Sequence, residues 1–199
     1  MRSRYYLTGL LFIILFNSSC KKEETIDDTH IKLYGKTYNI VKIGGKSWTN
    51  ANFEGAEGVY RDNNNHPEYG KFYTYAEVKA LKLPKGWRLP TKKDFVDLTK
   101  AIGVTDVNDQ IIDVTSLKKL TSSTLWRYIP GNNQSGFNAY PGGYYFDSVP
   151  SIDGTIAQFW TAEGLGFRIQ ENYNNNLKLM FYSDNDDPGI RYNIRFIKD

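Results

Sequence analysis

The chain contains one cysteine, Cys20, and this feature constrains its fold more than any other. A single cysteine cannot form a disulfide within the chain, so no cystine can hold a small domain together. If the first 19 residues are removed on export, about 180 remain, which suits one domain with a sizeable apolar core. We therefore expect one domain that hydrophobic packing stabilises.

The segment before Cys20 resembles a bacterial lipoprotein signal. It has a basic start, an apolar run shorter than the roughly 20 residues of a spanning helix, and small residues next to the cysteine: Arg2, Arg4, Tyr5 to Phe16, Ser18 and Ser19. Asn17 stands where such signals usually carry Leu, Val or Ile. The resemblance implies a signal peptide over residues 1–19, lipid attachment at Cys20 and a polar tether over residues 20–30. The membrane would be a partner through this lipid anchor, because several acyl chains hold a protein firmly whereas one does so only marginally.

The residues after Cys20 bear on localisation. Lys21-Lys22-Glu23-Glu24 is similar to the acidic export tag that carries some Bacteroidetes lipoproteins to the outer face of the outer membrane. A solvated tether is the alternative interpretation of these four residues. We expect an outer-membrane, lipid-anchored protein, and the sequence leaves open whether it faces the periplasm or the cell surface.

Charge and composition narrow the class of protein. Without Arg2 and Arg4, the 25 basic residues become 23 against 22 acidic ones, so the mature chain is nearly neutral. Near-neutrality gives no support for a nucleic-acid partner. Aromatic residues make up 15% of the chain, with 15 Tyr, and there are 17 Gly. This mixture favours a loop-rich domain outside the cytoplasm with much β-structure.

Local patterns predict both strands and helices. A hairpin is expected where two strands flank Gly44-Gly45, because glycine supplies the positive φ of a tight turn. Three helices are expected, the last of them short, and Thr91 and Asp94 form a capping box at the start of the second. The expected strands are 36–43, 46–49, 157–161 and 166–169, with an antiparallel pair of 177–182 and 192–197. The expected helices are 72–83, 91–102 and a short one over 115–120.

Several segments, in order along the chain, resemble the FISUMP family, the Fibrobacter succinogenes major paralogous domain. They are Ile43 to Trp48 with Asn52-Phe53, Tyr69 to Tyr75, Leu83 to Thr91, Ser135 to Gly143, Phe159 to Thr161 and Ile190 to Lys198. The resemblance indicates one FISUMP-like domain over residues 31–199. It implies an α+β, C-type lectin-like fold related to formylglycine-generating enzymes, with two helices flanking a small twisted antiparallel sheet and long loops carrying any site.

The motif residues also have a structural interpretation. Apolar residues, Gly and Pro mostly report packing and backbone shape, so we expect Trp87, Leu89, Phe137 and Trp160 in the core. Arg88 is expected to be paired or hydrogen-bonded near the sheet. The family's closing strand usually carries a cysteine, and Asn193-Ile194-Arg195-Phe196 keeps the arginine without that thiol.

Catalytic patterns are weak in this sequence. Two histidines, His30 and His66, lie in the tether region and in an Asn-rich loop, and we expect both to be solvated surface residues rather than catalytic bases. A hydrolase triad or a zinc site needs a larger set of ligands or bases. Formylglycine-generating enzymes rely on cysteine thiols, which the mature domain lacks. We therefore expect a protein that is not an enzyme and that carries no cofactor.

Calcium is the metal for which the sequence leaves a candidate binding site. Asp184, Asp186 and Gly189 have spacings reminiscent of an EF-hand loop. Pro188 and Arg195 occupy positions where that loop needs other residues, so the EF-hand interpretation fails. A looser calcium site that includes Asp187 remains a weak candidate.

Aromatic and amide residues in the loops are the candidate ligand contacts. Tyrosine faces and amide groups suit glycan or protein contacts, and the candidates are Tyr140, Tyr144, Tyr145, Tyr173 and Asn174. Alternatively, the tyrosines cover the edge of the core and the asparagines form turns. We expect a non-catalytic, lectin-like binding module of the cell envelope that binds a glycan or a surface protein, or that has a structural role. The alternatives are an enzyme on the formylglycine-generating fold with non-cysteine chemistry, and an adhesin or fibre accessory subunit.

Overall fold

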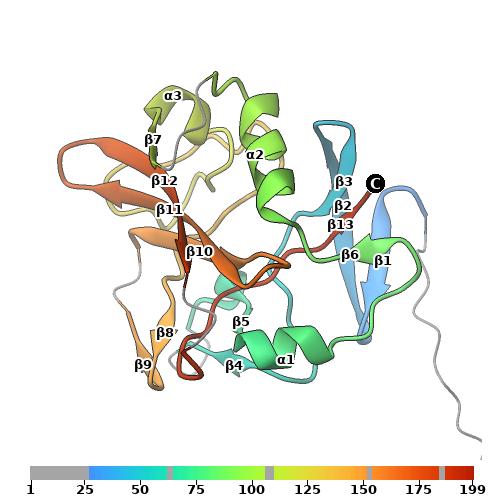
Figure 1. The fold of residues 1–199 in the computed structure, drawn as a ribbon. Helices are drawn as coiled ribbons and strands as arrows, with labels where there is room; N and C mark the ends of the chain where they lie inside the picture. Colours follow the sequence, from blue (N-terminus) through green and yellow to red (C-terminus); the bar gives the residue numbers. More distant parts are fainter. Residues whose placement is uncertain (1–26, 62–64, 106–109, 152–153, 184–186) are drawn as a thin grey trace, which may run out of the picture.

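A computed structural model describes residues 27–61, 65–105, 110–151, 154–183 and 187–199 of the chain. Two antiparallel sheets form its framework, and helix α2 lies between them (Figure 1). The structure is mostly β, with three α-helices in the described ranges. The α+β prediction is thus confirmed in its coarse form. The prediction of one small sheet with two helices named fewer sheets and helices than the described residues contain.

The first sheet has five strands in the order β1-β2-β3-β13-β6. Their bounds are His30–Leu33, Lys36–Ile43, Lys46–Thr49, Ile197–Lys198 and Trp87–Arg88. Gly44 and Gly45 have φ of 61° and 78° and join β2 to β3, so the predicted hairpin is confirmed. The sequence prediction did not include β1, which begins at the last residue of the expected tether.

The second sheet has four strands in the order β10-β11-β12-β7. Their bounds are Ile156–Trp160, Leu165–Asn172, Asn176–Ser183 and Gln110–Ile112. Alternate side chains point to opposite faces of a strand, and here one face packs into the core through Phe159, Phe167, Ile169 and Leu179. The other face carries the candidate site described below. Two small two-stranded sheets complete the β-structure: β4 (Val59–Tyr60) with β5 (Lys71–Phe72), and β8 (Tyr145–Phe146) with β9 (Val149–Pro150).

Helix α2 (Lys92–Ala101) begins at the predicted capping box, in which Thr91 Oγ1 accepts from Asp94 N. Gly103, with φ of 106°, follows its end. Helix α1 (Tyr75–Ala80) also has a capping box, formed by Thr74 and Glu77, and is shorter than predicted. Helix α3 is Val114–Leu117, and a single 3₁₀ turn, η2, covers Pro67–Tyr69. Among the described residues, no helix is long and apolar enough to span a membrane.

The core joins both sheets to helix α2. Phe95 and Leu98 of α2 lie in one buried cluster with Trp48 of β3 and with the inner side chains of the second sheet. The rings of Phe95 and Phe167 stack with centroids 4.1 Å apart. Each fully buried apolar side chain of this size contributes roughly 1.5–3 kcal/mol. Burial on this scale stabilises the described domain without a disulfide.

The prediction of an antiparallel pair between residues 177–182 and 192–197 is wrong. Strand β12 pairs instead with β11 and β7. The C-terminal segment, red in Figure 1, runs between the two sheets: Tyr192 bridges to Tyr73, Asn193 bridges to Phe159, and Ile197 pairs with both β3 and β6. The segment is apolar because it is buried between several elements, and not because it forms one long strand.

Candidate functional site

Three of the motif segments meet at the guanidinium of Arg195, which is fully buried. Its nitrogens donate to Asn52 Oδ1 at 2.7 Å, to the backbone oxygens of Thr49 and Phe137 at 2.9 and 2.8 Å, and to Asn138 O at 3.0 Å. Burial lowers the pKa of Arg195 to about 9, so the side chain stays charged at neutral pH. All four acceptors are neutral. The motifs therefore share a structural task, which is to hold the 137–138 loop on the first sheet.

A second buried polar group extends this framework. Asn52 Nδ2 and Asn193 Nδ2 both donate to Tyr69 O, at 2.8 and 2.9 Å, and Asn193 Nδ2 also reaches Lys71 O at 3.0 Å. These bonds satisfy carbonyls that the 69–71 segment would otherwise bury without partners. The motif asparagines thus stabilise the backbone and are not free to contact a ligand.

Arg88 is paired beside the first sheet, as predicted. Its Nη1 lies 2.5 Å from Asp94 Oδ2 and its Nη2 lies 2.8 Å from Asp199 Oδ1, while Lys46 Nζ lies 2.5 Å from Asp94 Oδ1. Burial alone would raise the pKa of Asp94, but the hydrogen bonds from Arg88, Lys46 and Thr91 outweigh it and hold that pKa well below its usual value. This ionic cluster ties the start of α2 to strands β3, β6 and β13.

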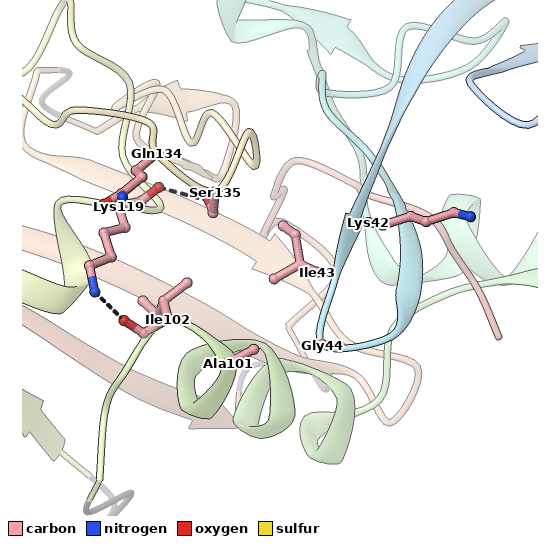
Figure 2. A pocket seen from close by; sticks show the side chains of 8 residues that line it. All are labelled: Lys42, Ile43, Gly44, Ala101, Ile102, Lys119, Gln134 and Ser135. Carbon is pink, nitrogen blue, oxygen red and sulfur yellow. Dashed lines mark hydrogen bonds between the residues drawn. The ribbon is translucent and has the colours of Figure 1, made fainter.

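One hollow of about 350 Å³ lies between the β2–β3 turn, the end of α2 and residues 134–135 (Figure 2). The polar side chains that line this hollow do not point toward a common position where a ligand could bind. Lys119 Nζ donates to Ile102 O at 2.7 Å, Ser135 Oγ donates to Lys119 O at 2.7 Å, and Figure 2 shows the Lys42 side chain pointing away from the hollow. The geometry gives this hollow no set of free groups for recognition.

The outward side of the second sheet is different, and we call it the Arg168 face. It consists of the outward side chains Gln158, Arg168, Gln170, Lys178, Met180 and Tyr182, together with Tyr144. A hollow of about 270 Å³ lies at this part of the sheet, and Gln170, Asn172, Lys178, Met180, Tyr182 and the buried Glu171 line it. Most of these side chains are half-buried, so they are ordered by their neighbours and still accessible.

Arg168 is fixed at the centre of this face. Its Nε donates to Gln158 Oε1 at 2.7 Å, and its guanidinium carbon lies 4.1 Å from the Tyr182 ring centroid and 5.0 Å from that of Tyr144. Opposite Tyr182 stands Gly166, where a Cβ would come within 2.5 Å of Gln158 Nε2 and 2.8 Å of Tyr192 Cε2. A glycine at this position allows the close packing that holds Gln158, and Gln158 in turn orients Arg168.

The five predicted contact residues do not form one surface. Tyr145 is 7% exposed and donates from its hydroxyl to Tyr60 O at 3.1 Å, so its side chain belongs to the core. Tyr140 is half-buried and receives a bond from Asn138 Nδ2 at 3.2 Å. Tyr173, 78% exposed, and Asn174 lie in the turn between β11 and β12. Of the five, only Tyr144 contacts Arg168.

Other predicted residues are placed as follows. Cys20, Asp184 and Asp186 lie outside the described residues. Asp187 accepts from Gly189 N at 2.8 Å, as expected of a turn residue. Within the described ranges, no group of three or more His, Cys, Asp or Glu side chains is placed to bind a metal ion. Phe137 and Trp160 are fully buried, as predicted, and Trp87 is buried.

Sequence reasoning missed Arg168, Gln158, Lys178 and Tyr182. A signal was present, since Phe167, Ile169 and Glu171 alternate with Arg168 and Gln170. Period-two alternation indicates a strand with one polar face. The sequence did not show that the polar side chains of two neighbouring strands would lie next to each other.

The fold and the face define a class: a mostly β domain built on antiparallel sheets, in which the β11–β12 part of one sheet face carries half-buried polar and aromatic side chains. The family model described as the Fibrobacter succinogenes major domain matches residues 41–198. The chain therefore belongs to that family. Comparisons with curated proteins and with solved structures found no match.

Proposed function

We propose that the chain is a bacterial cell-envelope lipoprotein whose non-catalytic, C-type lectin-like domain binds a glycan on the Arg168 face. The lipid anchor at Cys20 and the position at the outer membrane are parts of this proposal that rest on the sequence. The glycan is the ligand class that the face fits best, because tyrosine rings and amide groups lie together on it. A protein partner is the alternative ligand.

The observation that carries the proposal is the arrangement around Arg168. A cation held by Gln158 and by two tyrosine rings is already oriented before a ligand arrives, and pre-orientation reduces the entropy lost on binding. Ligand sites are usually concave and combine apolar walls with a few fixed polar groups. The neighbouring hollow of about 270 Å³ has Met180 and Tyr182 as apolar lining, and its other lining residues are polar or charged.

A glycan array and a pull-down from envelope extracts, both with the full-length protein in detergent, test this function. Binding of a sugar that Tyr144→Ala and Tyr182→Ala weaken would support the proposal, because both rings contact Arg168. Tyr145→Ala is a poor probe because its ring is buried. Capture of a protein without any sugar signal would favour the alternative ligand, and sugar binding that neither tyrosine variant weakens would contradict the site.

A further inference from the structure

We infer that the ligand of the Arg168 face is an acidic oligosaccharide whose carboxylate binds Arg168, with Lys178 as a second cation on the same face. This inference rests on the proposed glycan-binding function and adds the chemical class of the sugar. It follows from the positive charges on this face, from the hydrogen bonds and ring contacts that these charged groups already make, and from the hollow beside them.

The guanidinium of Arg168 has unused donors. Gln158 Oε1 accepts from its Nε, and within the described part of the chain neither Nη atom donates to another group. The guanidinium carbon lies over the rings of Tyr182 and Tyr144, at 4.1 and 5.0 Å from their centroids, and these contacts use none of its N–H donors. A planar carboxylate is the acceptor that matches two parallel N–H groups of an arginine.

Lys178 adds a second positive charge on the same face. It stands opposite Gln170, whereas Arg168 stands opposite Met180, so the two cations are diagonal neighbours at about 7–8 Å between their Cα atoms. Lys178 forms no ion pair with any residue that the structure describes. The two cations give this face a local positive charge, which favours an anionic ligand.

The carboxylate nearest in sequence does not neutralise these cations. Glu171 is buried, and its two oxygens accept from the backbone nitrogens of Tyr128 at 2.9 Å and Ile129 at 2.7 Å. It alternates with Gln170 along β11, so its side chain leaves the sheet on the opposite side. The positive charge of the Arg168 face therefore has no internal counterion among the described residues.

The surroundings of the two cations favour a sugar over a simple anion. Gln170 and Asn172 line the adjacent hollow, and their amide N–H groups can bond with hydroxyl groups. Asn172 Oδ1 already accepts from the backbone nitrogens of Asn174 and Asn176. Met180 and the Tyr182 ring supply apolar surface beside them, which a sugar ring can cover with its C–H groups. A carboxylated sugar combines all three features in one ligand.

Isothermal titration calorimetry with α-1,4-linked trigalacturonate tests the inference, using the full-length protein in detergent. The matched neutral ligand is the same trisaccharide with methyl-esterified carboxyl groups. We expect the acid to bind more tightly than the ester, and Arg168→Met to raise the Kd for the acid about 10- to 100-fold, the loss typical of a charge-assisted hydrogen-bond pair. Arg168→Lys keeps the charge without the planar fork and is expected to fall between wild type and Arg168→Met.

Lys42→Met is the control variant. It removes the same charge from an exposed position at the other hollow and is expected to leave the Kd unchanged (Figure 2). Equal binding of acid and ester, with an effect of Tyr182→Ala on both, would overturn the acidic class and leave the glycan function intact. An equal loss in Lys42→Met and Arg168→Met would show non-specific charge attraction and would also overturn the inference. If neither trisaccharide binds and the glycan array finds only neutral sugars, the acidic class is wrong and the glycan function stands. If neither trisaccharide binds and the array finds no sugar at all, both the acidic class and the glycan function are wrong.

Discussion

Replacement of Arg195 by methionine is expected to destabilise the domain more than any other single arginine substitution that we consider. The change removes four hydrogen bonds of 2.7–3.0 Å and leaves their four acceptors without a donor. Each buried acceptor without a partner costs about 1–3 kcal/mol, and part of this cost is offset because the guanidinium no longer has to be desolvated. We expect a net loss of about 3–5 kcal/mol, the range found when one member of a buried charged network is removed.

Urea denaturation of the full-length protein in detergent, followed by tryptophan fluorescence, measures this loss. At an m-value of about 2 kcal/mol per molar, the midpoint would fall by about 2 M. Arg168→Met is the comparison variant, because Arg168 is half-buried and donates one side-chain hydrogen bond, to the buried Gln158 Oε1. We expect it to cost about 1–2 kcal/mol, because only one buried acceptor loses its donor. A loss below about 1 kcal/mol for Arg195→Met, or equal losses for the two variants, would refute the structural role of Arg195.

Three further predictions concern other parts of the chain. Hydrogen bonds hold the pKa of the Asp94 carboxyl below its usual 3.8. Its negative charge therefore stabilises the fold above that pH, and this contribution is lost as the pH falls. Asp94→Asn should lower the free energy of unfolding at about pH 6 and make the unfolding midpoint less dependent on pH down to about pH 3. Gly131→Ala would place a Cβ 2.1 Å from Thr121 O and should cost about 1–3 kcal/mol in thermal unfolding, whereas no loss would show that the loop moves freely. Cys20→Ala should abolish labelling with radioactive palmitate, and equal labelling of variant and wild type would reject the lipid anchor.

Local sequence signals predicted local structure well. The capping box at Thr91 and Asp94 and the glycine turn at 44–45 depend on residues close together in the chain, and both are confirmed. The strand expected at 192–197 failed because its partners are residues 73, 88 and 159 and β3, all distant in sequence. Apolar composition indicates burial and does not identify the strand that covers a segment.

The candidate site was harder to predict for the same reason. Tyr144 and Tyr145 are adjacent in sequence, and the structure places one against Arg168 and the other in the core. Loop composition cannot separate them, because neighbouring residues in an extended chain point in opposite directions. Arg168 was overlooked because its surroundings come from β10, β12 and residue 144, and these only meet in the folded chain.

The most direct test of the binding account is a chemical-shift titration of the isotopically labelled full-length protein with trigalacturonate. The account predicts that the largest backbone shifts will fall on residues 166–170 and 178–182, together with the amide of Tyr144. Shifts that cluster instead around Lys42, Gly44 and Lys119, or that spread evenly over the surface, would contradict it.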